Sequence, residues 1–141
     1  MLKLSKKVEY ALMALLHMEG RRAAELATAR EIADSCGAPV ELLGKVLQAL
    51  ARGGLIESEQ GARGGYRLAR PADRITLGEV IEVVDGPVHI AACQDDPSRC
   101  GQYPTCNIRQ PVVRVQRELQ DYMYKLSLAA FRREPAGAAT R

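Results

Sequence analysis

The first half of the chain contains three stretches in which apolar residues recur every three or four positions, the period of an amphipathic helix. They cover residues 5–19, 28–36 and 39–52. Each has a favourable first residue, Ser5, Thr28 or Pro39, and each is followed by glycine, which commonly ends a helix. Thr28 and Glu31 also form the pattern of a capping box, in which each side chain bonds the other residue's backbone amide. Gly37 makes a short turn between the second and third helices, and the pair is typical of a helix-turn-helix.

Two short strand-like runs follow the third predicted helix. They are Leu55–Ser58 and Tyr66–Ala69, and the glycine-rich segment 59–65 turns one back onto the other. A hairpin in this place predicts the wing of a winged helix. Arg63 stands near its tip, where the glycines let the backbone approach DNA phosphates or a minor groove.

These elements supply the candidate DNA contacts. The expected residues are Glu41, Lys45, Gln48 and Arg52 on the third helix, and Gln60, Arg63, Tyr66 and Arg67 in the wing. Two helices packed in an ordinary core would share much of the helical pattern, so the helix pair alone does not decide for DNA. The wing favours DNA as the partner.

The second half of the chain predicts two further helices. Thr76 and Glu79 form another capping-box pattern, which opens a helix through Val84. Apolar residues then recur along one long predicted helix over residues 110–133. This helix carries more apolar surface than one small winged domain can cover, so we expect it to pair with the same helix of a second subunit in a C2 homodimer.

The predicted fold class is therefore mainly α with a small β wing. It combines a winged helix-turn-helix domain with a long C-terminal dimerisation helix. The expected parts are a DNA-binding domain over 1–86, a cysteine-rich loop over 87–109, the dimerisation helix over 110–133 and a disordered tail over 134–141.

Three of the four cysteines, Cys93, Cys100 and Cys106, lie in one short segment, separated by six and five residues. Proline and glycine between them disfavour regular structure, so a loop can turn the sulfurs toward one centre. The spacing fits neither a Cys-x-x-Cys redox pair nor the paired ligands of most structural zinc sites, and it favours an iron-sulfur cluster held by thiolates. Zinc, disulfides that involve Cys36, and thiols without a common role stay open on spacing alone.

Charge, targeting signals and possible catalytic residues limit which class of protein this chain can belong to. The net charge of +3 is mildly basic, so a DNA footprint depends on where the arginines lie. No secretory leader and no membrane-spanning stretch is evident, so we expect a cytoplasmic protein without a membrane partner, whose thiols stay reduced. No nucleophile with a base and an orienting group is visible, which argues against an enzyme.

The chain resembles the Rrf-two-type family of bacterial winged-helix transcriptional regulators over about residues 1 to 131. The resemblance rests on the three-cysteine loop and on four other segments. These are Leu4-Ser5 with Tyr10-Ala11-Leu12, the run from Leu50 to Ile56, the wing segment Gly64-Gly-Tyr-Arg-Leu-Ala69, and Ile75-Thr-Leu-Gly-Glu-Val-Ile81.

The resemblance implies a homodimer that binds double-stranded operator DNA and ligates a cluster through Cys93, Cys100 and Cys106. A [2Fe-2S] cluster is favoured, and [4Fe-4S] is the alternative. In the iron-sulfur-biogenesis branch of the family, a histidine three residues after the last cysteine completes the cluster. Arg109 stands at that position here, and its guanidinium has no lone pair to offer iron.

In the nitric-oxide-responsive branch, an acidic residue on the first helix of the other subunit is the fourth ligand. The matching position is Glu9, which makes Glu9 the leading candidate, ahead of Cys36, His89 and a water or small molecule. The expected function is a regulator whose operator affinity follows iron-sulfur status, redox state or nitric oxide. A cluster-free regulator that senses through thiols or zinc is the alternative, and an iron-sulfur carrier or electron-transfer protein is less favoured.

Overall fold

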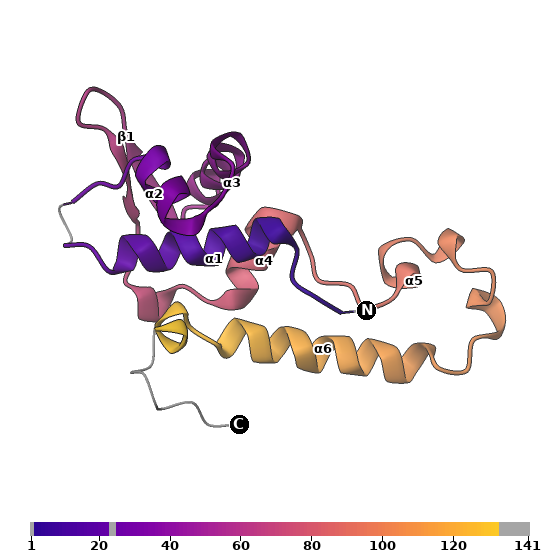
Figure 1. Ribbon diagram of the computed structural model, residues 1–141. Helices are drawn as coiled ribbons and strands as arrows, with labels where there is room; N and C mark the ends of the chain where they lie inside the picture. The colour runs from indigo at the N-terminus through magenta and orange to yellow at the C-terminus, as the bar shows by residue number, and fades with distance from the viewer. Residues whose placement is uncertain (1, 23–24, 133–141) are drawn as a thin grey trace.

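The computed structural model of the protein describes residues 2–22 and 25–132 (Figure 1). Its first three helices are α1 Lys6–Glu19, α2 Ala29–Cys36 and α3 Val40–Arg52. Each lies where the hydrophobic period predicts it. Ser5 caps α1, because its hydroxyl accepts a hydrogen bond from the Val8 amide at 3.2 Å.

The start of α2 corrects one detail of the sequence prediction. Thr28 Oγ1 accepts a hydrogen bond from the Glu31 amide at 3.1 Å, as a capping box requires. The Glu31 carboxylate does not return the bond to Thr28 and pairs instead with the Arg21 guanidinium. A charged donor makes a stronger hydrogen bond than a backbone amide, so Arg21, just after α1, replaces the reciprocal half of the box.

The turn between α2 and α3 confirms the prediction made from its glycine. Gly37 has φ +65°, the left-handed conformation that glycine adopts most readily. The Ala38 amide then donates to the Ala33 carbonyl at 3.0 Å and closes the turn. Pro39 was predicted as the first helical residue, but it stands one place earlier, at the N-cap of α3.

The wing is an antiparallel hairpin of β1 Ile56–Glu59 and β2 Gly65–Leu68. Both strands lie one residue away from their predicted bounds. Leu55 lies before the strand, in the turn that follows α3, where its amide donates to the Leu50 carbonyl at 3.0 Å. Gly64 must be glycine in this hairpin, because a Cβ there would meet the Glu59 carbonyl oxygen at 2.3 Å.

The helix α4 Leu77–Asp85 carries the complete capping box that the sequence predicts. Thr76 Oγ1 accepts from the Glu79 amide at 3.2 Å, and the Glu79 carboxylate accepts from the Thr76 amide at 2.9 Å. Arg70 also pairs with Glu79, at 3.1 Å. Partial burial would raise the pKa of Glu79, but the bonds from Thr76 and Arg70 outweigh it, and the pKa is lowered.

The last long helix is shorter than predicted. It is α6 Arg109–Lys125, and it does not continue to residue 133, because Leu126 takes an extended conformation. Residue 133 and the predicted disordered tail 134–141 lie outside the described residues.

After α6 the chain returns to the winged domain. The Leu77 amide donates to the Leu126 carbonyl at 2.9 Å, and the Leu128 amide donates to the Ile75 carbonyl at 2.7 Å. These two backbone bonds replace the next helical bonds of α6. The helical period could not reveal this, because Leu126 and Leu128 also suit a continued helix.

Contact between α4 and α6 requires a small residue on α4. A Cβ at Gly78 would lie 2.5 Å from the ring of Tyr124 on α6. The Tyr124 hydroxyl donates to the Glu82 carboxylate, and this hydrogen bond is the main reason that the pKa of Tyr124 rises to about 12. Glycine therefore lets α6 lie directly against α4.

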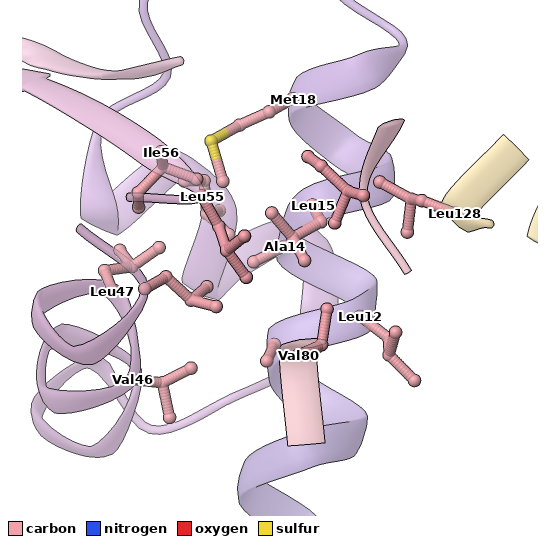
Figure 2. Close-up of a cluster of buried hydrophobic side chains, with 14 of the residues drawn as sticks. Leu12, Ala14, Leu15, Met18, Val46, Leu47, Leu55, Ile56, Val80 and Leu128 are labelled. Carbon is pink, nitrogen blue, oxygen red and sulfur yellow. The ribbon is translucent and has the colours of Figure 1, made fainter. Parts of the chain in front are cut away.

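The hydrophobic core surrounds α1, as Figure 2 shows. Leu15 of α1 lies between Leu47 of α3 on one side and Leu128 on the other. Leu15 and Leu128 are 0% and 1% exposed. The segment after α6 thus belongs to the core of the winged domain.

Replacing Leu128 by alanine should lower the free energy of unfolding by about 2–4 kcal/mol, because it leaves a cavity beside Leu15. Leu2→Ala deletes the same atoms from a side chain that is 70% exposed, and it should change the free energy by less than about 0.5 kcal/mol. Urea unfolding followed by circular dichroism compares the two variants. Equal destabilisation would contradict the docking of Leu128.

Candidate DNA-binding surface and cysteine loop

One face of α3 is polar and exposed. It carries all four predicted contacts on this helix: Glu41, Lys45, Gln48 and Arg52. Their spacing of four, three and four residues places them in one stripe along the helix. The opposite face is buried in the core through Leu43, Val46, Leu47 and Leu50. The stripe is thus directed away from the domain, as a helix that enters a major groove requires.

The tip of the wing presents a second polar surface. Gln60 and Arg63 are exposed there, and within residues 2–22 and 25–132 Arg63 takes part in no ion pair. Figure 1 shows the wing extending from the helices as a narrow hairpin. The Arg63 guanidinium is therefore available to a DNA phosphate.

Arg67 and Tyr66, the other two predicted wing contacts, have structural partners. Arg67 pairs with Glu57 at 3.2 Å and with Glu59 at 2.9 Å, across the two strands. Hydrogen bonds to these carboxylates raise the pKa of Arg67, and their negative charges neutralise its positive charge. Tyr66 is half-buried, and its backbone exchanges two hydrogen bonds with Ala27. Both residues therefore hold the wing in place.

The three-cysteine segment leaves the body of the molecule as a series of short turns. Cys93 lies in the single-turn helix α5 Ala92–Asp95, and Cys100 and Cys106 follow the 3-10 turns Pro97–Arg99 and Tyr103–Thr105. All three thiols are free and half-buried. In Figure 1 this excursion (residues 87–108, between Gly86 and α6) and the wing lie at opposite ends of the molecule.

The structure does not draw these sulfurs together. In the part of the chain that it describes, no group of three or more His, Cys, Asp or Glu side chains could hold a metal ion. Free, partly accessible thiols are the groups that ligate iron-sulfur clusters, so the three cysteines are chemically suitable ligands. To bind one, the loop would have to bring Cys93, Cys100 and Cys106 closer together.

The candidates for a fourth ligand lie on separate elements. Glu9 is on α1, where its carboxylate pairs with Lys6 at 2.8 Å and its side chain is 43% exposed. His89 lies 3.8 Å from Asp95. Cys36 ends α2, across the molecule from the excursion in Figure 1, and burial raises the pKa of its thiol. Arg109, at the start of α6, stacks on the Tyr103 ring with its guanidinium carbon 4.5 Å from the ring centre.

Three glutamines that the sequence analysis missed hold the excursion: Gln116 and Gln120 attach it to α6, and Gln94 bonds within it. Gln116 Oε1 accepts from the Ile90 amide at 3.0 Å, and Gln120 Nε2 donates to the Val88 carbonyl at 3.2 Å. Gln94 Oε1 accepts from the Ile90 and Ala91 amides, both at 3.1 Å. The spacing of Gln116 and Gln120 on one helix face was the only signal, and it is common on exposed helices.

Comparison with known sequences identifies a family. The Rrf2 family model, described as an iron-dependent transcriptional regulator, matches residues 4–134. A protein of Aquifex aeolicus named as an HTH-type transcriptional regulator is 30% identical over 120 residues, which cover 84% of this chain and 83% of that protein. Protein aau3 of Rhizobium meliloti is 37% identical over 92 residues, 65% of this chain, but this chain spans only 59% of the length of aau3.

Solved structures with the same fold include two regulators. CymR, the global cysteine regulator of B. subtilis, has a TM-score of 0.69 at 24% identity, with 92% of this chain and 95% of CymR covered. IscR of T. potens has a TM-score of 0.69 at 23% identity, with 99% of this chain and 94% of IscR covered. At these identities the likeness shows the fold alone.

The resemblance stated from the sequence is confirmed by the family match, and the fold class by the wing on a mainly helical structure. In the described residues, no helix has both the length and the apolar character that crossing a membrane requires. The Aquifex aeolicus relative is named as a transcriptional regulator, and CymR as a global cysteine regulator. The chain belongs to the Rrf2 (Rrf-two-type) family of winged-helix transcriptional regulators.

Proposed function

We propose that this protein is a homodimer that binds operator DNA through α3 and the wing, and that an iron-sulfur cluster on the cysteine loop controls its affinity. The observation that carries the proposal is a set of three free cysteines on an excursion hydrogen-bonded to α6. A [2Fe-2S] cluster is the preferred occupant, and [4Fe-4S] is the alternative.

DNA recognition is assigned to two surfaces with different tasks. The stripe on α3 offers side-chain charges and amides that can read base edges in the major groove. Arg63 on the wing tip offers a charge to the backbone or the minor groove. Two copies of α3 would have to enter grooves about 34 Å apart, so the dimer geometry sets the affinity.

Support for the dimer comes from α6. None of its 17 residues is buried in the single chain. Val115 and Tyr122 are 49% and 63% exposed, although both are large and apolar or aromatic. Such side chains along one helix favour a helix-helix contact with a second copy.

Cys93, Cys100 and Cys106 would hold the cluster, and the other subunit's Glu9 would complete it after giving up its ion pair with Lys6. When bound, the cluster would supply iron that oxidants or nitric oxide can alter. Cys93 moves together with Gln94 in the same helical turn, and Gln94 and Gln116 share the Ile90 amide. Reordering the loop would thereby shift its attachment to α6.

The size of the expected control is modest. Allosteric coupling of about 1–3 kcal/mol between loop and DNA would change operator affinity by roughly 5- to 150-fold. Because the excursion and the wing are at opposite ends of the molecule, this coupling would act through α6 and the dimer.

A second candidate is control by the thiols themselves, or by zinc, without iron. It is favoured by the separation of the three sulfurs in the described residues and by their partial exposure, which admits oxidants. Metal-free protein would then respond to peroxide. A carrier or electron-transfer role has weaker support, because such a protein has no need of the exposed stripe on α3.

Arg63→Ala should weaken operator binding roughly tenfold and reduce the slope of log affinity against log salt by about 1, because one phosphate contact is lost. Arg67→Ala is the matched control. Its guanidinium is already paired with Glu57 and Glu59, so the salt slope should stay within error. Fluorescence anisotropy at several salt concentrations measures both. A larger slope change for Arg67→Ala would reverse the assignment.

Protein purified without oxygen should contain iron and sulfide in near-stoichiometric amounts and absorb visible light. Cys100→Ser should lose most of both, since one of three thiolate ligands is gone. Cys36→Ser should keep them, because Cys36 lies on α2. Iron and sulfide analysis of the wild type and both variants measures the cluster content. Wild-type protein that stays colourless after reconstitution would leave thiol or zinc sensing as the function.

A further inference from the structure

A small cavity lies between α5, the 3-10 turn Tyr103–Thr105 and the first turns of α6. Its volume is about 270 Å³. It is lined by Cys93, Gln94, Tyr103, Arg109, Val112, Val113 and Gln116. None of these lining residues is acidic.

The side-chain amides of Gln94 and Gln116 line this cavity, and the oxygen of each accepts hydrogen bonds from backbone amides. Gln94 Oε1 accepts from the Ile90 and Ala91 amides, and Gln116 Oε1 accepts from the Ile90 amide. These bonds fix both amide orientations, so the NH2 groups cannot exchange places with the oxygens. Gln94 Nε2 is buried and has no acceptor among the described residues. A buried donor of this kind calls for an acceptor that the chain does not supply.

Arg109 adds a positive charge to the same cavity. Its guanidinium stacks on the Tyr103 ring and donates one hydrogen bond, at 3.3 Å, to the Tyr103 carbonyl. In residues 2–22 and 25–132 no carboxylate pairs with it. The remaining N–H groups of Arg109 can therefore bind an oxyanion. A metal cation would be repelled, because the guanidinium offers charge and no lone pair.

The other wall is apolar. Val112 and Val113 line the cavity beside Arg109, at the start of α6 where the helix dipole is positive. An ion that is hydrated all round, such as phosphate, gains nothing from this wall. A ligand with an anionic end and a short hydrocarbon end matches both the polar side, with Arg109 and Gln94, and the apolar wall.

We propose that this cavity binds a small organic monocarboxylate. The carboxylate lies between Arg109 and the Gln94 NH2 group, and the hydrocarbon part lies against Val112 and Val113. Such a ligand would stand beside Cys93 and contact the residues that attach Ile90 to α6. The cavity would thereby give the loop a small-molecule input that needs no metal, and the site goes beyond the proposed cluster.

The test uses full-length, metal-free protein and butyrate as the probe, with butyramide as its uncharged analogue. Butyrate should bind saturably with a dissociation constant on the order of 1 mM, which is ordinary for so small a ligand. It should shift the NMR signals of the Gln94 NH2 group and the Arg109 Nε–H group. Butyramide should bind at least about tenfold more weakly, because it lacks the charge that Arg109 recognises.

Arg109→Gln should weaken butyrate binding at least about tenfold while thermal unfolding stays cooperative. Arg114→Gln, which removes an equal charge from an exposed position on α6, should leave binding unchanged and is the matched control. No saturable butyrate binding, equal binding of butyramide, or an unchanged Arg109→Gln variant would overturn the proposal. Tighter binding of inorganic phosphate would overturn the carboxylate assignment in favour of an oxyanion site.

Binding of butyrate and binding of a cluster can succeed or fail separately. Butyrate binding by a protein that never takes up iron would leave the carboxylate site standing while the cluster fails. Iron uptake by a protein that ignores butyrate would leave the cluster standing while the carboxylate site fails.

Discussion

Two backbone hydrogen bonds hold the end of α6 on the winged domain, and the arrangement of the molecule depends on them. They join Leu126 to Leu77 and Leu128 to Ile75, and they place the Leu128 side chain in the core. Near its middle, α6 is bonded to the excursion through Gln116 and Gln120. The helix is thus fixed at its C-terminal end and near its middle, while none of its own residues is buried in the single chain.

This attachment explains how a distant loop can matter to DNA. The cysteine excursion and the wing are at opposite ends of the molecule, so a ligand on the loop cannot touch DNA bound by the same chain (Figure 1). In the proposed homodimer, it would change where α6 starts and how the two copies of α6 meet. Since α6 is anchored in the winged domain by Leu128, a shift of the helix would move the reading helices relative to each other.

Local patterns predicted most of the winged domain. The three helices, the wing and the complete capping box at Thr76 depend on residues close in sequence, and the structure has them within a residue or two. The end of α6 could not be predicted in this way, because Leu128 fits a longer helix as well as a core position. Its burial is decided by Ile75 and Leu77, which are distant in the chain.

The functional surfaces show the same difference between features set by residues close in sequence and features set by distant contacts. The α3 stripe follows from helical period, but the pairing of Arg67 with Glu57 and Glu59 depends on strand register, which the sequence did not settle. The cysteine spacing identified a common loop without saying whether its sulfurs meet. The roles of Gln94 and Gln116 require knowing which backbone amides lie beside them.

Control of DNA binding by the cysteine loop can be measured as the operator affinity of one preparation, first with the loop loaded with its cluster and again after the metal is removed. Coupling through α6 predicts that the two dissociation constants differ by at least about fivefold. Identical constants, with both forms folded and dimeric, would contradict control of DNA binding by the loop.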